Sequence, residues 1–193
     1  MATSKVAIAN LALQKLGAAR ISSLSQNNPN AASMSAAYDA IRRRELRTYE
    51  WSFATRRASI AADSAQTAWG SHNRFTLPAD YLYLIRDDET GQAVDWKIES
   101  ATDGVFIITD DAAPLQIRYV ADIDDPTYYD SLFIDSFACA LALHCCEEIT
   151  QSTSKKQGIL ADYDRAIKTA MQQGAIEKPA TEFPIDEWIN ARL

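Results

Sequence analysis

The chain changes its hydrophobic period at residues 46–58, which read Leu46-Arg47-Thr48-Tyr49-Glu50-Trp51-Ser52-Phe53-Ala54-Thr55-Arg56-Arg57-Ala58. Before this stretch, apolar residues recur every three or four positions, as they do in an amphipathic helix. After it, up to about residue 120, short apolar runs are broken by turn residues, which is typical of an antiparallel sheet. The stretch therefore predicts a junction between a helical segment and a β segment.

Two helices are expected on the N-terminal side of the junction. In the first, Thr3 or Ser4 can cap the start and Gly17 the end. Its apolar contacts repeat at helical spacing at Val6, Ala9, Leu13 and Leu16. Residues 18–30, rich in Ser and Asn and with Pro29 inside, predict a loop. A second helix is expected from about residue 31 to residue 49.

Several strands are expected on the C-terminal side of the junction. The first is an extended stretch made of residues 51–53 and 58–60, and further runs follow at 75–77, 81–85, 96–98, 105–109 and 115–120. Residues 87–91 predict a turn. Asp110, Asp111 and Pro114 separate the last two runs and predict a hairpin-like loop.

The helical period then returns. Asp125 followed by Pro126 predicts a helix start, and this helix should reach about Thr150. A last helix is expected over residues 155–173, with Gly174 ending it. Beyond it lies a tail with two prolines and four apolar side chains, Phe183, Ile185, Trp188 and Ile189.

These elements predict an α+β fold: a four-helix bundle core with an inserted antiparallel β-sheet and an extended C-terminal tail. Residues 1–50 would supply the first two bundle helices, residues 51–121 the inserted β subdomain, residues 122–174 the last two helices and residues 175–193 the tail.

Composition limits the class of protein. The chain has 193 residues, with 26 acidic and 19 basic side chains and a net charge of −7. Its length fits one domain, or one domain with a small insertion. Four Trp, eight Tyr and six Phe exclude a disordered acidic tail.

Three Cys, an odd number, argue against a disulfide framework and for a reducing compartment. The apolar run at residues 136–146 is shorter than the ~20 residues that span a bilayer. Since residues 1–5 do not open a signal peptide, we expect a soluble protein, assembled in the cytoplasm and not bound to a membrane.

Charge is divided unevenly along the chain. Residues 1–57 carry nine basic and three acidic side chains, a balance of +6, so the remainder carries −13. Much of the positive charge lies in one cluster, formed by Arg42, Arg43, Arg44, Arg47, Arg56 and Arg57. Arginine forks match phosphate oxygens, so DNA contact is one interpretation. The favoured interpretation is that these arginines pair with the acidic remainder, within a subunit or between subunits. Asp39, Glu45 and Glu50 lie nearby and already neutralise part of the cluster. A chain with a pI near 4.8 is also a poor non-specific DNA binder.

Catalytic and metal-binding patterns are weak. There is no glycine-rich phosphate loop, no Gly-x-Ser-x-Gly elbow and no His-Glu-x-x-His. Cys139 and the run His144-Cys145-Cys146 suggest a metal cluster, but adjacent helical residues point about 100° apart, so packing is the better interpretation. We therefore expect no enzyme activity, no cofactor and no metal.

The tail has two interpretations. Phe and Trp are side chains that anchor interfaces. The tail either folds back over its own helices or docks onto another protein, which makes Phe183, Ile185, Trp188 and Ile189 candidate contact residues.

Two short elements resemble the head–tail adaptor proteins of short-tailed bacteriophages, the tail tubular protein A family. Residues 51–58 resemble that family's Trp-x-Phe-Ala-x-Arg-Arg element, and residues 75–82, Phe-Thr-Leu-Pro-Ala-Asp-Tyr-Leu, resemble its Leu-Pro-x-Asp-Tyr/Cys-Leu element. The stretch at residues 13–24 resembles the family's opening. Ser52 and Thr55 stand at variable positions of the first element.

The resemblance implies a structural protein of the virion tail or neck. It implies a dodecameric ring, a homo-oligomer that joins the portal protein to the tail nozzle protein and leaves a channel through which DNA passes without specific binding. It also implies that the C-terminal segment reaches the portal. A ring would let a basic flank of one subunit meet an acidic flank of the next. The alternatives are a small DNA-binding or DNA-packaging accessory protein that uses residues Arg42–Arg57 and, more distantly, a hydrolase built on acidic residues.

Overall fold

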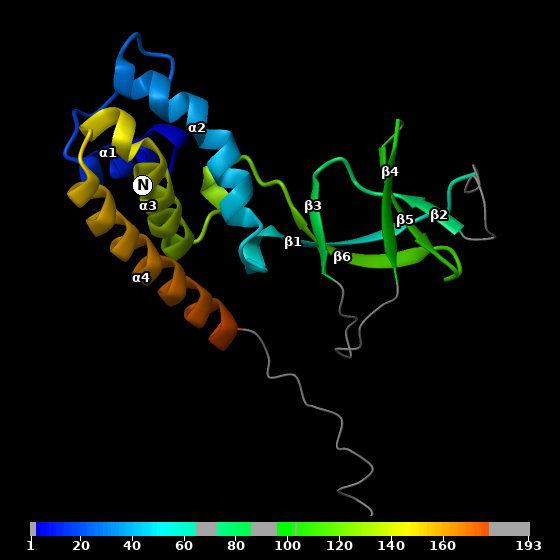
Figure 1. The fold of residues 1–193 in the computed structure, drawn as a ribbon. Coiled ribbons are helices and arrows are strands. Elements are labelled where there is room, and N and C mark those ends of the chain that lie inside the picture. The colour runs from blue at the N-terminus through cyan, green and yellow to red at the C-terminus, as the bar shows by residue number, and fades with distance from the viewer. Residues whose placement is uncertain (1–2, 65–72, 86–95, 103, 178–193) are drawn as a thin grey trace, which may run out of the picture.

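The computed structural model describes residues 3–64, 73–85, 96–102 and 104–177. Within these residues lie four α-helices and two antiparallel three-stranded sheets, so the fold is mixed α+β. The helices gather at one end of the molecule and the sheets at the other, and the N-terminus lies in the helical part (Figure 1). Among the described residues, no helix has both the length and the apolar character needed to cross a membrane.

The first two helices follow the expected caps with one change. Helix α1 spans Lys5–Leu16, the side chain of Ser4 accepts from the amide of Ala7, and Gly17 adopts the left-handed conformation (φ 73°). Helix α2 spans Pro29–Leu46. The prediction that Pro29 lies inside the loop is wrong, because Asn28 caps the helix and proline suits its first turn.

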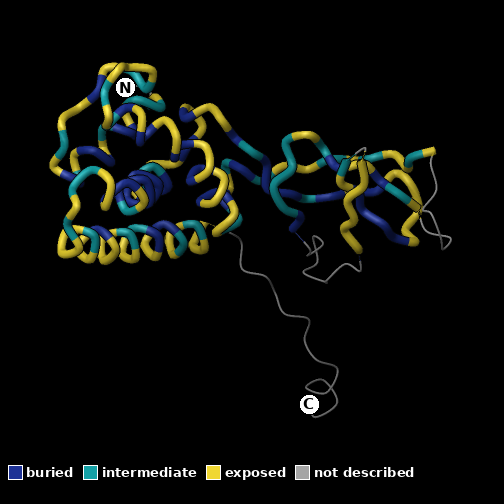
Figure 2. Tube along the Cα trace, turned by 45° about the horizontal axis from the view of Figure 1, so that its top comes forward, coloured by how far each residue is buried: buried dark blue, intermediate teal, exposed yellow. Residues whose placement is uncertain are grey.

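Helix α3, Ser131–Thr150, is the centre of the helical part and packs against α1, α2 and α4. Half of its residues are buried, which explains its continuous apolar character. Figure 2 shows the buried positions gathered inside this part. The start predicted at Asp125 belongs instead to a short 3₁₀ helix, η2, Pro126–Tyr128, and Asp130 caps α3.

Helix α4 spans Thr153–Glu177, so the prediction that Gly174 ends it is wrong. Gly174 serves close packing: a Cβ placed there would lie 2.9 Å from Cε1 of Tyr49. The residue is small because Tyr49 occupies the space, and the helix continues past it.

The six strands form two sheets. In the first, β1 (Thr55–Ile60), β6 (Leu115–Ala121) and β3 (Tyr81–Ile85) lie in the order β1-β6-β3. In the second, β2 (Asn73–Thr76), β5 (Gly104–Thr109) and β4 (Lys97–Ala101) lie in the order β2-β5-β4. Each of the runs expected at residues 58–60, 75–77, 81–85, 96–98, 105–109 and 115–120 overlaps one of these strands. The turn expected at residues 87–91 lies outside the described residues.

Two predictions about the strands are wrong. Residues 51–53 are not extended, because residues 52–54 form a 3₁₀ helix, η1, Ser52–Ala54. Trp51 and Phe53 turn into the helical part, where each packs against Phe133 with ring centroids 5.1 and 5.0 Å apart. Strands β5 and β6 do not form a hairpin, because residues 110–114 carry the chain from one sheet to the other.

Candidate functional site

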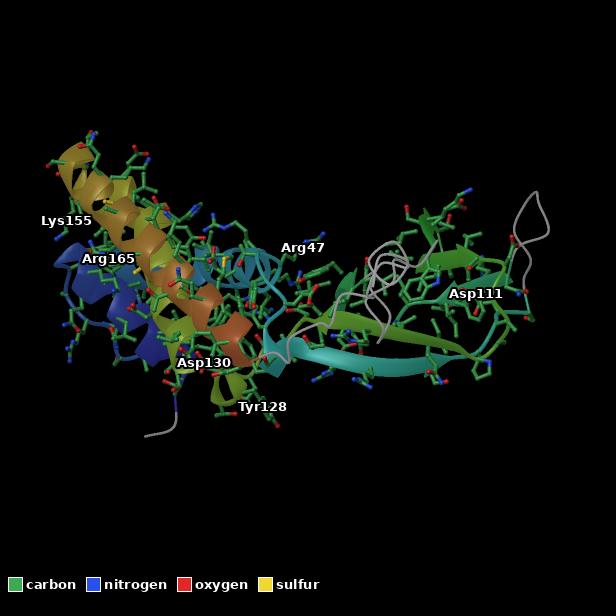
Figure 3. All side chains as sticks on the ribbon, turned by 90° about the horizontal axis from the view of Figure 1, so that it is seen from below. Arg47, Asp111, Tyr128, Asp130, Lys155 and Arg165 are labelled. Atoms are coloured by element: carbon green, nitrogen blue, oxygen red, sulfur yellow. The ribbon has the colours of Figure 1, made fainter. Side chains whose placement is uncertain are left out.

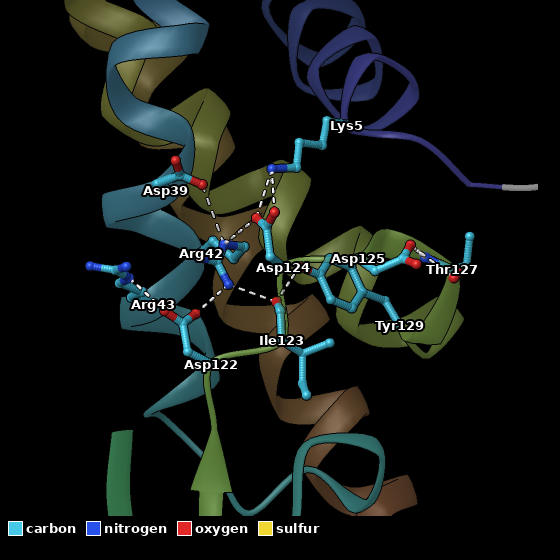
Figure 4. A network of polar contacts seen from close by, with 10 residues as sticks. All are labelled: Lys5, Asp39, Arg42, Arg43, Asp122, Ile123, Asp124, Asp125, Thr127 and Tyr129. Atoms are coloured by element: carbon cyan, nitrogen blue, oxygen red, sulfur yellow. Dashed lines mark hydrogen bonds and ion pairs between the residues drawn. The ribbon is translucent and has the colours of Figure 1, made fainter. Parts of the chain in front are cut away.

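The predicted arginine cluster lies where the helical part meets the sheets, and its centre is a network around Asp122 (Figure 4). Arg42 and Arg43 follow one another on α2, and both form ion pairs with the carboxylate of Asp122, just after β6. The Arg43 Nε–Asp122 Oδ2 distance is 2.8 Å. Arg42 Nη1 also donates to the carbonyl oxygen of Ile123 at 2.6 Å.

Asp124 extends this network to α1. Lys5 Nζ lies 2.7 Å from Asp124 Oδ1 and 2.8 Å from Oδ2, and Arg42 Nε lies 3.7 Å from the same carboxylate. The hydrogen bond from Lys5 lowers the pKa of Asp124, and the charges of Lys5 and Arg42 act in the same direction. We call Lys5, Arg42, Arg43, Asp122 and Asp124 the junction network.

Burial decides which member of the junction network matters most. The side chain of Arg42 is 3% exposed, whereas that of Arg43 is 60% exposed. Burial opposes the charge of Arg42, but the hydrogen bond and charge of Asp122 outweigh burial, and the pKa of Arg42 is raised. A guanidinium enclosed in this way clamps residues 122–124 against α2 and has no room for a phosphate.

Arg44 has a different acidic partner. Its Nη2 lies 2.9 Å from Glu45 Oε1, and Glu45 is fully buried. Tyr163 of α4 donates to Glu45 Oε2 at 3.1 Å. Burial raises the pKa of Glu45, and the hydrogen bond from Arg44 opposes that rise.

Arg47 and Arg56 reach the β3 side of the junction. Arg47 donates to the carbonyl of Leu82 at 2.6 Å, and Figure 3 shows it between the helices and the strands. Arg56 forms an ion pair with Asp80, whose other oxygen accepts from Tyr119 Oη at 3.1 Å. Arg57 is exposed on β1, opposite Arg118 of β6.

The six arginines therefore do not form one basic surface. Arg42, Arg43, Arg44 and Arg56 pair with acidic side chains of this chain, and Arg47 binds a backbone carbonyl. Of the acidic partners, Asp80 belongs to the element at residues 75–82, whereas no feature of the sequence pointed to Asp122 or Asp124. The imbalance between +6 and −13 was a signal for such pairing, but charge counts do not say which aspartate meets which arginine.

The helical part has a hollow of about 260 Å³, which we call the aromatic pocket. Its walls are Tyr49, Trp51, Ser52, Phe53, Tyr128, Tyr129, Asp130, Leu132, Ala170, Gln173, Gly174 and Glu177. It lies beside the C-terminal end of α4, where Figure 3 shows Tyr128 and Asp130. The Tyr129 hydroxyl does not serve a ligand here, because it donates to the carbonyl of Ile123 at 2.8 Å.

A second hollow, of about 300 Å³, holds two carboxylates. Asp135 lies 2.9 Å from Lys15 Nζ, and Asp162 lies 3.5 Å from Arg165 Nη1. Each carboxylate thus has a cation of its own, an arrangement unlike an acid–base pair in which two carboxyl groups share one reacting bond.

The cysteines are core residues. Cys139, Cys145 and Cys146 are free thiols and all are buried. Burial raises the pKa of Cys145 to about 11. In the part of the chain that the structure describes, no three His, Cys, Asp or Glu side chains gather to hold a metal ion.

The four tail residues, Phe183, Ile185, Trp188 and Ile189, lie outside the described residues. In comparison with known proteins, no family model matches the chain and no curated protein matches it.

Proposed function

We propose that this chain is a head-to-tail adaptor of a short-tailed bacteriophage virion, similar to tail tubular protein A. In this proposal the helices form a four-helix bundle core, the β segment is an insertion and the tail is extended. Twelve copies form a ring that joins the portal protein to the nozzle protein and leaves a channel for DNA.

One observation carries the proposal: the two elements that resemble the family contact each other. Arg56 of the first element pairs with Asp80 of the second, 24 positions away. Trp51 and Phe53 of the first element pack on Phe133 in the core. Residues that belong to one interacting unit support the resemblance better than two short matches would separately.

The charges also support a protein that lets DNA pass. A protein that holds DNA needs several free Lys or Arg side chains against phosphates. Here four of the six clustered arginines bind acidic side chains of the same chain. Nothing in the described residues favours the DNA-binding alternative over the adaptor. The same contacts weaken the expectation that these arginines join neighbouring subunits.

The proposal assigns portal binding to Phe183, Ile185, Trp188 and Ile189. Aromatic side chains are frequent anchors of interfaces, and a segment of this composition needs an apolar partner surface. Their position after the last helix allows them to reach a second protein while the helices stay in place.

Negative-stain imaging of the purified chain, alone and mixed with the portal of the same phage, tests the proposal. We expect rings, or rings only on the portal. The double variant Phe183→Ser, Trp188→Ser should lose portal-bound rings. The matched control Leu160→Ser removes an apolar side chain that is 46% exposed on α4 and should keep them. Monomers that never assemble on the portal would contradict the proposal, and salt-sensitive DNA retention would favour the alternative.

A further inference from the structure

Aromatic rings form a large part of the wall of the aromatic pocket. Tyr49, Trp51, Phe53 and Tyr128 contribute these rings. Helix α4 contributes Ala170 and Gly174 together with the longer polar side chains of Gln173 and Glu177. Aromatic walls suit an apolar or aromatic occupant, which can stack edge to face against them.

The mouth of the pocket exposes apolar surface. Tyr128 lines the pocket and is 66% exposed. Its ring therefore offers apolar surface to a docked segment at the edge of the hollow.

The chain itself supplies a segment that begins at this mouth. Glu177 lines the pocket and is the last residue of α4, and sixteen residues follow it. Phe183 lies six residues and Trp188 eleven residues after Glu177, which corresponds to roughly 20 and 36 Å of extended chain.

We infer that residues 178–193 dock into the aromatic pocket of their own chain, with Phe183 or Trp188 as the inserted side chain. The same chain is the favoured source because a short tether holds a segment at an effective concentration of roughly millimolar. This inference does not depend on the adaptor proposal. If both hold, the pocket shields the tail until the portal takes it.

Photo-crosslinking of the full-length chain tests the docking. Benzoylphenylalanine replaces Phe183 in one variant and Trp188 in another, and Leu160 in the control, in each case without any portal present. We expect at least one of the tail variants to cross-link within one chain, to residues 49–53 or 128–132, with a yield unchanged by tenfold dilution. The control should not reach these residues. Adding Tyr128→Ser should lower the tail yield severalfold.

Hydrogen exchange gives a second readout. In the double variant Phe183→Ser, Trp188→Ser, amides of residues 128–133 should exchange at least about fivefold faster than in the unmodified chain. Leu160→Ser should leave them unchanged. Cross-links only between chains would assign the pocket to a second copy. Cross-links elsewhere, or unchanged exchange, would also overturn the inference. Because no portal is used, failure here and failure of ring assembly are separate results.

Discussion

Two neighbouring arginines that share one carboxylate provide a test of how burial sets the value of an ion pair. Arg42→Gln and Arg43→Gln remove the same charge, change helix propensity little and each break a contact with Asp122. They differ in exposure, since the side chain of Arg42 is 3% exposed and that of Arg43 is 60% exposed. The pair therefore compares a buried and an exposed arginine of the same charge at neighbouring positions. Arg42 also contacts Asp39, Asp124 and the carbonyl of Ile123, which its burial makes possible.

The expected magnitudes differ severalfold. Removing one partner of a buried pair costs about 3–5 kcal/mol, and the lower end applies to Arg42→Gln because Asp122 keeps Arg43. The carbonyl of Ile123 also keeps the hydrogen bond from Tyr129. Arg43→Gln removes an exposed contact and should cost less than about 1 kcal/mol.

Urea unfolding followed by circular dichroism and tryptophan fluorescence measures both costs. Thermal unfolding gives the corresponding shifts in Tm, at about 2–4 °C per kcal/mol for a chain of this size. Arg42→Gln should lower Tm by roughly 6–12 °C and Arg43→Gln by less than about 4 °C. Equal losses in the two variants would refute the argument, because burial would then not decide the energy of the junction network.

Two further predictions concern α4 and Glu45. Gly158→Ala should stabilise the protein by up to about 1 kcal/mol, since nothing lies within 4 Å of the added Cβ. Gly174→Ala should lose that gain or lower Tm, since its Cβ would meet Tyr49. Equal gains for the two variants in thermal melts would contradict this packing. Burial raises the pKa of Glu45 above its ordinary 4.5, so the stability linked to this group is present below that pH and is lost as pH rises through the raised value. Relative to the unmodified chain, the free energy of unfolding of Glu45→Gln should therefore be higher at pH 7 than at pH 4, as measured by urea titration. If the difference between the two proteins is the same at both pH values, the assignment is contradicted.

Local signals in the sequence predicted most of the elements. Ser4 and Gly17 bound α1 because a cap needs only a side-chain acceptor at one end and a left-handed residue at the other. Alternating Leu115, Ile117 and Tyr119 identified β6 because period two is a property of the strand itself.

Long-range choices were not predictable in the same way. Asp110 and Pro114 look alike whether the next strand folds back on β5 or crosses to another sheet, and only packing decides. Gly174 resembles a helix stop, but its role depends on Tyr49, 125 positions away. The same holds for the arginine cluster, because the partner of Arg42 is 80 positions along the chain.

The sheets also leave and rejoin the helices at one point. Thr55, the first residue of β1, lies opposite Val120 near the end of β6, so the chain enters and exits the β part side by side. Because its two ends are adjacent, the β segment can be lengthened, shortened or exchanged during evolution without moving the residues on either side. Substitutions in the β part can therefore accumulate while the packing around α3 stays the same.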